Sequence, residues 1–226
     1  MFEDLHIDHL VVVTGPTSSG KSTLQELIAA DTINGEMRSL LPKNISGWFQ
    51  LCHRDYDGSL VSSMDKPVKG IVLHYDMMRP IKKFLPGYEE DVITTLIERA
   101  NKVTVLIIKP EMDVLLDQLK RSELGGNGLK KKPGGLGLRT AMTRAVQFIP
   151  PGLRKLIKKK LSPDKKLTVT DFNEVLFFKY QEEGWLDEWF RKLDLYLKEK
   201  ADAGYIIDHH YVRSSPDDMT QWEVLK

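Results

Sequence analysis

The apolar residues of this chain gather in short continuous runs, and four of these runs predict buried β-strands. They cover residues 9–13, 70–76, 102–108 and 204–208, and polar or turn-forming residues bound each of them. Apolar runs without alternation are typical of parallel strands that are covered on both faces. A shorter strand-like piece lies at 48–51. The pattern therefore predicts a parallel sheet whose strands are far apart in sequence.

The segments between these runs have apolar positions three and four residues apart, which predicts amphipathic helices. The predicted helices cover 23–30, 89–101, 112–122, 171–180 and 185–201. After a loop at 214–218, the last residues predict a few closing helical turns. Strands that alternate with helices favour an α/β fold with a doubly wound, mainly parallel sheet and flanking helices.

The connection between the first strand and the first helix carries the most specific motif of the chain. Residues 15–22 match G-x-x-x-x-G-K-[ST] without a mismatch. Glycines let the backbone curl so that several N–H groups point at phosphate oxygens, and the helix adds the positive end of its dipole. Lys21 would reach the β- and γ-phosphates, and the Ser22 hydroxyl would bind Mg²⁺. The residues predicted to hold the nucleotide are Gly15, Pro16, Thr17, Ser18, Ser19, Gly20, Lys21, Ser22 and Thr23.

Residues 9–30, about a tenth of the chain, resemble the phosphate-binding loop of the P-loop NTPases. Within them, residues 15–22 are similar to the corresponding residues of P-loop kinases and of the tRNA dimethylallyltransferases. The resemblance implies a sheet of the P-loop NTPase type that binds ATP or GTP together with Mg²⁺. It is specific for nucleotide phosphate and does not identify the reaction.

Asp76 is the best candidate for the group that accepts a proton during the reaction. It follows an apolar run at the carboxyl edge of the sheet, where open α/β sheets bind their ligands, and His74 shares its face of the strand. Resemblance to small-molecule P-loop kinases implies an aspartate after the strand beside the P-loop strand. Asp76 could instead hold Mg²⁺ through water or cap a turn. Asp208 is a rival for the metal-linked role, and Arg79 could clamp an anionic acceptor.

Residues 122–168 predict a basic, lid-like insertion with helical segments. The order of strand, Pro110, helix and Arg121 resembles the segment that leads into the lid of nucleoside and small-molecule kinases. In such kinases lid arginines close over the phosphates, so the resemblance makes Arg121, Arg139 and Arg144 candidates for stabilising the transferred phosphoryl group. Our catalytic candidates are Lys21, Asp76, Arg121 and Arg144.

The length of 226 residues fits one domain, and we predict a single P-loop kinase-like domain over 1–226. Hydrophobic residues make up 41% and charged residues 29%, which is ordinary for a globular protein. The single cysteine, Cys52, excludes an internal disulfide framework and a thiolate metal cluster. No apolar run approaches a membrane span of about 20 residues, and the acidic start does not resemble a signal region. We therefore expect a cytoplasmic protein without a transmembrane segment.

The net charge of +1 conceals a strong separation of charge along the chain. Residues 120–166 contain fourteen Lys or Arg and two acidic residues, which is a net charge of +12, so the remainder carries −11. Residues 153–161 combine an apolar stripe with basic faces. Such a helix either packs on its own domain or lies on an anionic membrane. We expect residues 130–160 to contact an anionic surface or nucleic acid.

These features favour an ATP-dependent kinase that moves the γ-phosphoryl group to a small-molecule acceptor. One alternative is a nucleotide-controlled ATPase or switch that contacts a membrane or partner through its basic helix. Another is a dimethylallyltransferase-like enzyme acting on RNA, although the chain is short for that family and lacks D-S-x-Q-x-Y after the second strand. No motif in the sequence identifies the acceptor. Resemblance to the P-loop kinases implies that residues 36–70 help to wall its pocket, where Arg38, His53 and Arg54 are either substrate contacts or ordinary solvated charges.

Overall fold

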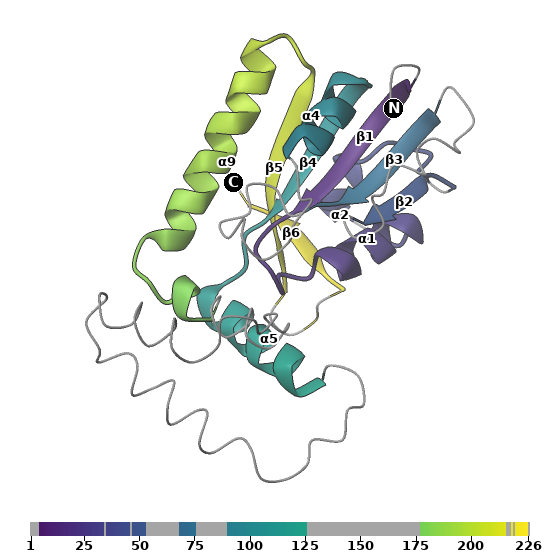
Figure 1. Cartoon of the computed structure of the whole chain (residues 1–226). Helices are drawn as coiled ribbons and strands as arrows, with labels where there is room; N and C mark the ends of the chain where they lie inside the picture. Colours follow the sequence, from purple (N-terminus) through teal and green to yellow (C-terminus); the bar gives the residue numbers. More distant parts are fainter. Residues whose placement is uncertain are drawn as a thin grey trace, which may run out of the picture.

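Six strands of the chain pair in one sheet, in the order β2-β3-β1-β4-β5-β6 (Figure 1). This computed structural model describes residues 5–33, 35–45, 47–52, 68–75, 90–125, 177–215, 218 and 220–225, with the backbone alone at 52, 90–92 and 120–125. The strands are β1 (Ile7–Thr14), β2 (Phe49–Cys52), β3 (Val68–His74), β4 (Ala100–Ile108), β5 (Ile207–Ser214) and β6 (Trp222–Val224). The helices are α1 (Lys21–Ala29), α2 (Gly35–Ser39), α4 (Glu90–Glu98), α5 (Met112–Gly125) and α9 (Trp185–Asp202).

The central strand β1 pairs in parallel with β3 on one side and with β4 on the other. Val12 lies opposite Leu73 of β3 and Val105 of β4, and all three side chains are fully buried. β2 and β5 extend the parallel sheet outward, and β6 closes it with an antiparallel pair. The predicted α/β fold with a mainly parallel sheet is confirmed. The apolar runs arise because these strands are covered on both faces.

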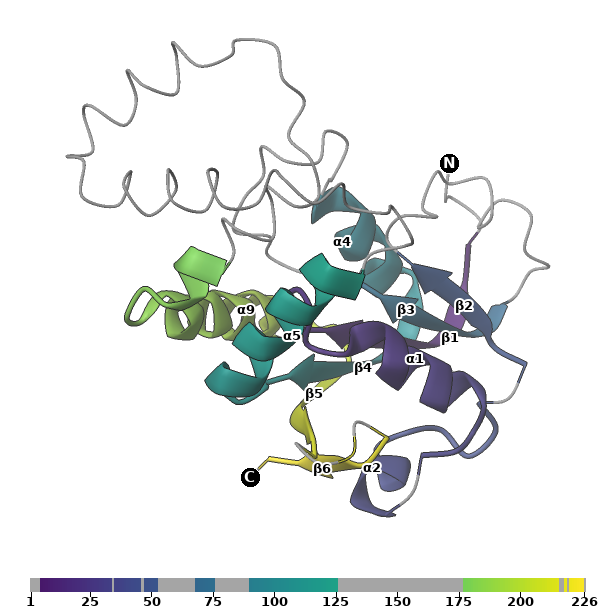
Figure 2. The same cartoon turned by 90° about the horizontal axis from the view of Figure 1, so that it is seen from below.

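Helices cover both faces of the sheet (Figure 2). Helices α4, α5 and α9 contribute to a core on one face, and α1 and α2 contribute to a core on the other. Helix α9 is tied to its neighbours by polar contacts as well. Tyr211 of β5 donates a hydrogen bond to the Asp194 carboxylate at 2.7 Å, and the hydroxyls of Thr94 and Tyr196 lie 2.9 Å apart. Burial, reinforced by the Asp194 carboxylate, raises the pKa of Tyr211.

Two elements near the end of the chain differ from the sequence prediction. The last parallel strand is Ile207–Ser214 instead of 204–208, and residues 222–224 form an antiparallel strand where helical turns were predicted. Both strands lie toward the edge of the sheet, where only some side chains are buried. Their sequences therefore lack the continuous apolar run that marked the central strands. Helix α5 also continues past residue 122 to Gly125.

Glycine at position 70 is required by close packing on β3. A Cβ atom built there would overlap the six-membered ring of Trp48. Trp48 is 9% exposed and belongs to the core that α1 shares with the sheet. The missing side chain thus lets an indole lie directly on the strand, which the glycine in an apolar run had not indicated.

Several predictions lie outside the described residues. Residues 122–125 of the predicted insertion continue α5, whereas 126–168 lie outside, including the basic residues 130–160. Among the described helices, none combines the length and the apolar character needed to cross a bilayer.

A half-buried histidine occupies the amino-terminal part of β1, on the α1 side of the sheet. His9 Nε2 and Thr104 Oγ1 are hydrogen-bonded at 2.8 Å, and the His9 ring lies 5.7 Å from that of Trp48. Burial lowers the pKa of His9 to about 4, the Lys102 charge acts in the same direction, and Asp208 opposes both. His9 is therefore neutral in the folded protein near neutral pH.

We expect His9 to make the protein less stable as the pH falls. The unfolded chain takes up a proton near pH 6.5 and the folded chain near pH 4, so protons bind preferentially to the unfolded state between these values. After allowance for solvent screening of a half-exposed group, the free energy of unfolding should fall by about 1–2 kcal/mol over this range.

Urea unfolding of His9→Asn between pH 4 and 7 should show a shallower pH dependence than the unsubstituted protein. Burial also lowers the pKa of His210, so some dependence should remain. His209→Asn, at an exposed position of β5, is the control. Equal slopes for His9→Asn and the unsubstituted protein would contradict the account.

Candidate functional site

Residues 15–20 connect β1 to α1 at the carboxyl edge of the sheet. Their backbone is unusual, because Gly15 (φ 155°), Ser18 (φ 65°) and Gly20 (φ 90°) all have positive φ. Gly20 is the N-cap of α1, makes no side-chain capping bond, and accepts the first helical hydrogen bond from Leu24 N–H at 2.9 Å. The amino end of the helix therefore opens onto the loop without a side-chain cap, which is a favourable place for an anion.

The start of this 15–22 loop packs closely on the end of β4. A Cβ atom at position 15 would lie 2.8 Å from Ser19 Oγ and 2.9 Å from the Cβ of Ile108. Both the positive φ and this lack of space require glycine at this position. The Ser19 hydroxyl is itself buried, and it has no hydrogen-bond partner among the described residues.

The Lys21 side chain folds back over the loop that precedes it. Its ammonium donates hydrogen bonds to the carbonyl oxygens of Gly15 at 3.0 Å and Pro16 at 2.6 Å. Lys21 is only 5% exposed, and a buried ammonium needs such acceptors. The positive charge is thereby fixed at the loop and does not extend into solvent as a surface lysine would.

Ser22 faces the end of the neighbouring strand β3. Its Oγ lies 3.3 Å from Nδ1 of His74, and Ser22 is exposed. His74 is opposite Val13 in the parallel register, and the next residue, Tyr75, donates its N–H to the Val13 carbonyl at 3.0 Å. His74 is predicted to share a face of the strand with Asp76, and the sequence assigns it no role. One clue to a role for His74 is its place at the end of a strand that pairs with β1, the strand before the 15–22 motif.

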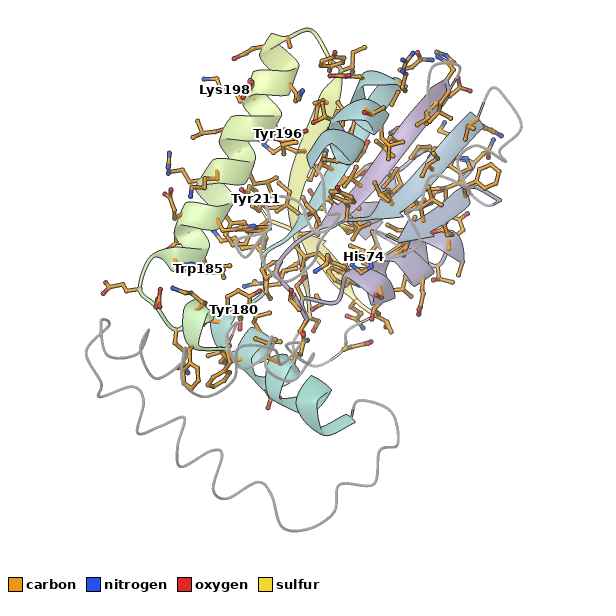
Figure 3. The ribbon with its side chains drawn as sticks, viewed as in Figure 1. His74, Tyr180, Trp185, Tyr196, Lys198 and Tyr211 are labelled. Carbon is orange, nitrogen blue, oxygen red and sulfur yellow. The ribbon has the colours of Figure 1, made fainter. Side chains whose placement is uncertain are left out.

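The loop is also held from the far end of the chain. The N–H of Thr17 donates a hydrogen bond to the Tyr180 hydroxyl at 2.9 Å, across 163 positions of sequence. Tyr180 is 4% exposed and its ring lies 5.4 Å from that of Trp185 at the start of α9 (Figure 3). No local pattern in the sequence connects Tyr180 to the loop, so the sequence alone does not indicate this contact.

Other predicted site residues lie partly or wholly outside the described residues. Asp76, Arg79, Arg139 and Arg144 lie outside, as do His53 and Arg54. The backbone of Arg121 belongs to α5, and its side chain lies outside the description. The structure brings together the motif residues 15–23 and leaves the positions of these other groups as predictions.

Two other predicted site residues, Asp208 and Arg38, are among the described residues, and both form ion pairs within the fold. The predicted position of Asp208 at the end of a strand is wrong, because it lies opposite Thr104 near the amino-terminal start of β5, away from the carboxyl edge that carries the loop. Its carboxylate pairs with Lys102 at 3.0 Å. Arg38 pairs with Asp31 at 3.1 Å and donates to carbonyl oxygens of the turn that follows α2, at Leu41, Pro42 and Lys43.

The chain matches no model of a protein family, and a search of curated proteins finds no match either. Within the described residues no three His, Cys, Asp or Glu side chains gather as a protein-only metal centre would require. The site therefore consists of a loop with fixed amides, one buried ammonium, one exposed hydroxyl and one imidazole.

The Tyr180 contact predicts a specific loss when its hydroxyl is removed. Tyr180→Phe keeps the ring in place but leaves the Thr17 N–H without this partner. The free energy of unfolding should fall by about 1 kcal/mol, the usual net value of one hydrogen bond. Hydrogen exchange at the Thr17 amide should accelerate. Tyr205→Phe, at a half-exposed tyrosine beside the end of α9, is the matched control, and unchanged exchange at Thr17 would disprove the tether.

Proposed function

We propose that this chain is a P-loop nucleotide-binding enzyme, and that it transfers the γ-phosphoryl group of ATP or GTP to a small-molecule acceptor. The observation that carries the proposal is the Lys21 ammonium, fixed across the 15–22 loop by the Gly15 and Pro16 carbonyls. The buried Lys21 ammonium lies next to a helix end without a side-chain cap, at the carboxyl edge of a parallel sheet. This arrangement suits a polyphosphate better than it suits a neutral ligand.

The loop offers the groups that a triphosphate needs. Main-chain N–H groups of residue 18 and of residues 20–23 would hold phosphate oxygens, because those of Thr17 and Ser19 are bonded to Tyr180 and Pro16. The helix end and Lys21 would neutralise the charge of the phosphates. The buried Ser19 hydroxyl is the kind of group that an absent ligand or water satisfies. The main-chain N–H groups, the helix end and the Lys21 side chain are already held in place before binding. Little ordering of the loop is therefore required when a nucleotide binds.

The residues also fit a divalent cation next to the phosphates. Ser22 presents an exposed hydroxyl oxygen, and His74 places an imidazole nitrogen 3.3 Å from it. Such a cation would neutralise charge on the nucleotide phosphates. Ser22 would hold the cation on the side of α1.

The chemical step requires little covalent work from the protein. The acceptor hydroxyl oxygen forms a bond to the γ-phosphorus while the bond from that phosphorus to the bridging oxygen of the nucleoside diphosphate breaks. Asp76 accepts the acceptor's proton, and Arg121 or Arg144 neutralises the transferred group. The parallel pairing of β3 with β1 supports this role for Asp76, which follows His74 by two residues beyond the end of β3.

Calorimetry with ATP and with GTP, in the presence of Mg²⁺, tests nucleotide binding. A screen of metabolites for acceptor-dependent consumption of ATP then tests transfer. Hydrolysis that is slow and independent of any acceptor would move the assignment to a nucleotide-controlled switch. Transfer of a dimethylallyl group to RNA would move it to the RNA-modifying class.

Loss of the Lys21 ammonium should remove most nucleotide affinity. The third N–H of the ammonium and its charge would act on the phosphates, and a charge-assisted hydrogen bond of this kind accounts for roughly 3 kcal/mol. Lys21→Ala should therefore weaken binding of ATP about 100-fold. Lys69→Ala, at an exposed lysine of β3, should bind as the unsubstituted protein does. Equal affinity of the two variants, with both folded by circular dichroism, would remove Lys21 from the site.

Asp76→Asn should separate binding from turnover. An amide cannot accept the proton of the acceptor, and loss of a general base costs about 100-fold or more in rate. Calorimetric binding of ATP should change little. Asp187→Asn, at an exposed aspartate of α9, is the control for removal of a negative charge. Unchanged turnover in Asp76→Asn would exclude Asp76 as the base.

A further inference from the structure

The geometry points to His74 as a direct ligand of the nucleotide-bound cation, alongside Ser22, so that the site favours Mn²⁺ and related transition metals over Mg²⁺. This inference rests on the proposed function, because nucleotide phosphates would complete the coordination. Its basis is the 3.3 Å separation of Ser22 Oγ and His74 Nδ1.

The separation of the two atoms suits neighbouring ligands of one ion. Metal–ligand bonds of about 2.1–2.3 Å at a right angle place two ligand atoms roughly 3.0–3.3 Å apart. A cation bound between Ser22 and His74 would therefore replace their present polar contact without a large movement of either residue.

Both residues are positioned by main-chain structure. Ser22 lies in the first turn of α1, whose first bond joins Leu24 N–H to Gly20. His74 is the last residue of β3 and is fixed by its parallel pairing opposite Val13 and by the Tyr75 N–H bond that follows. Ligands on paired regular elements keep their geometry better than ligands on loops. Two such elements meet here at the same edge of the sheet.

The kind of donor decides which cation is preferred. Mg²⁺ selects oxygen ligands and retains its waters, whereas imidazole nitrogen suits transition metals. A carboxylate at this position would add a negative charge and an oxygen donor, and both would favour Mg²⁺. An imidazole adds nitrogen and no negative charge, so the preference shifts toward Mn²⁺, Co²⁺ and similar ions.

A simpler role for His74 is a hydrogen bond that orients the Ser22 hydroxyl and nothing more. The two roles differ in whether nitrogen is bonded to the metal. Electron spin-echo spectroscopy of Mn²⁺ detects a directly bonded imidazole nitrogen, and this readout does not depend on turnover. The probe is Mn²⁺ with the β,γ-methylene analogues of ATP and GTP, whose bridging atom is carbon, at one fixed pH near 7.5.

We expect nitrogen coupling in the complex of the unsubstituted protein and its loss in both His74→Ala and His74→Asn. In competition with Mg²⁺, the preference for Mn²⁺ should fall about tenfold or more in the variants. His209→Asn, at an exposed histidine of β5, should retain the coupling and so excludes adventitious histidine binding. Circular dichroism and metal-free binding of the analogue show that each variant is folded.

Two negative results have different meanings. Nucleotide bound with Mn²⁺ but without nitrogen coupling would overturn the role of His74 as a ligand and leave the proposed function intact. Failure of the unsubstituted protein to bind either analogue with either cation would overturn the proposed function and this inference with it. Coupling that persists in His74→Asn and His74→Ala would assign the nitrogen to another residue and would also overturn the inference.

Discussion

The pairing of β1 with both β3 and β4 is the constraint on which the rest of the structure depends. Val11, Val12 and Val13 have no exposed surface, so the strand is packed on both faces as well as hydrogen-bonded on both edges. A shift of register by one residue would turn every side chain to the opposite face. The point at which β1 ends is therefore fixed, and with it the start of the 15–22 loop.

The loop itself has a backbone that the chain would not adopt without support. Ser18 is a non-glycine residue with positive φ, which is uncommon and costs free energy. Contacts from three directions compensate for this cost: the end of β4 at Ile108, the hydroxyl of Tyr180, and the Lys21 ammonium within the loop. A loop held in this way keeps its N–H groups in place before a ligand arrives, so binding does not have to order them.

The sequence was sufficient for the parts of this structure that depend on local pattern. The apolar runs at 9–13, 70–76 and 102–108 predicted the three central strands, because strands buried on both faces must be apolar throughout. The motif predicted a turn between strand and helix, and the structure has one there. Strands at or next to the edge of the sheet carry polar side chains at exposed positions, which is why the sequence predicts helix at β6 and places β5 too early.

Contacts between distant segments could not be predicted in this way. Thr17 and Tyr180 are 163 positions apart, and neither has a sequence environment that indicates the other. The same holds for Trp48 on Gly70, where periodicity gives no indication that an indole fills the space of a missing side chain. Asp208 is predicted at the end of a strand because the sequence places that strand too early. In the structure it is the second residue of β5, opposite Thr104 of β4.

An imidazole next to Ser22 also determines how metal and nucleotide would depend on each other. The described residues around the loop supply the Lys21 ammonium and the positive end of α1, and His74 adds no negative charge. Little in this set attracts a cation by charge alone, so the attraction has to come from the phosphates. In the proposed function the Asp76 carboxylate accepts the proton of the acceptor and does not bind the metal. Metal and nucleotide would then bind cooperatively, because each supplies what the protein alone leaves out: the phosphates contribute the charge, and the metal joins them to Ser22 and His74.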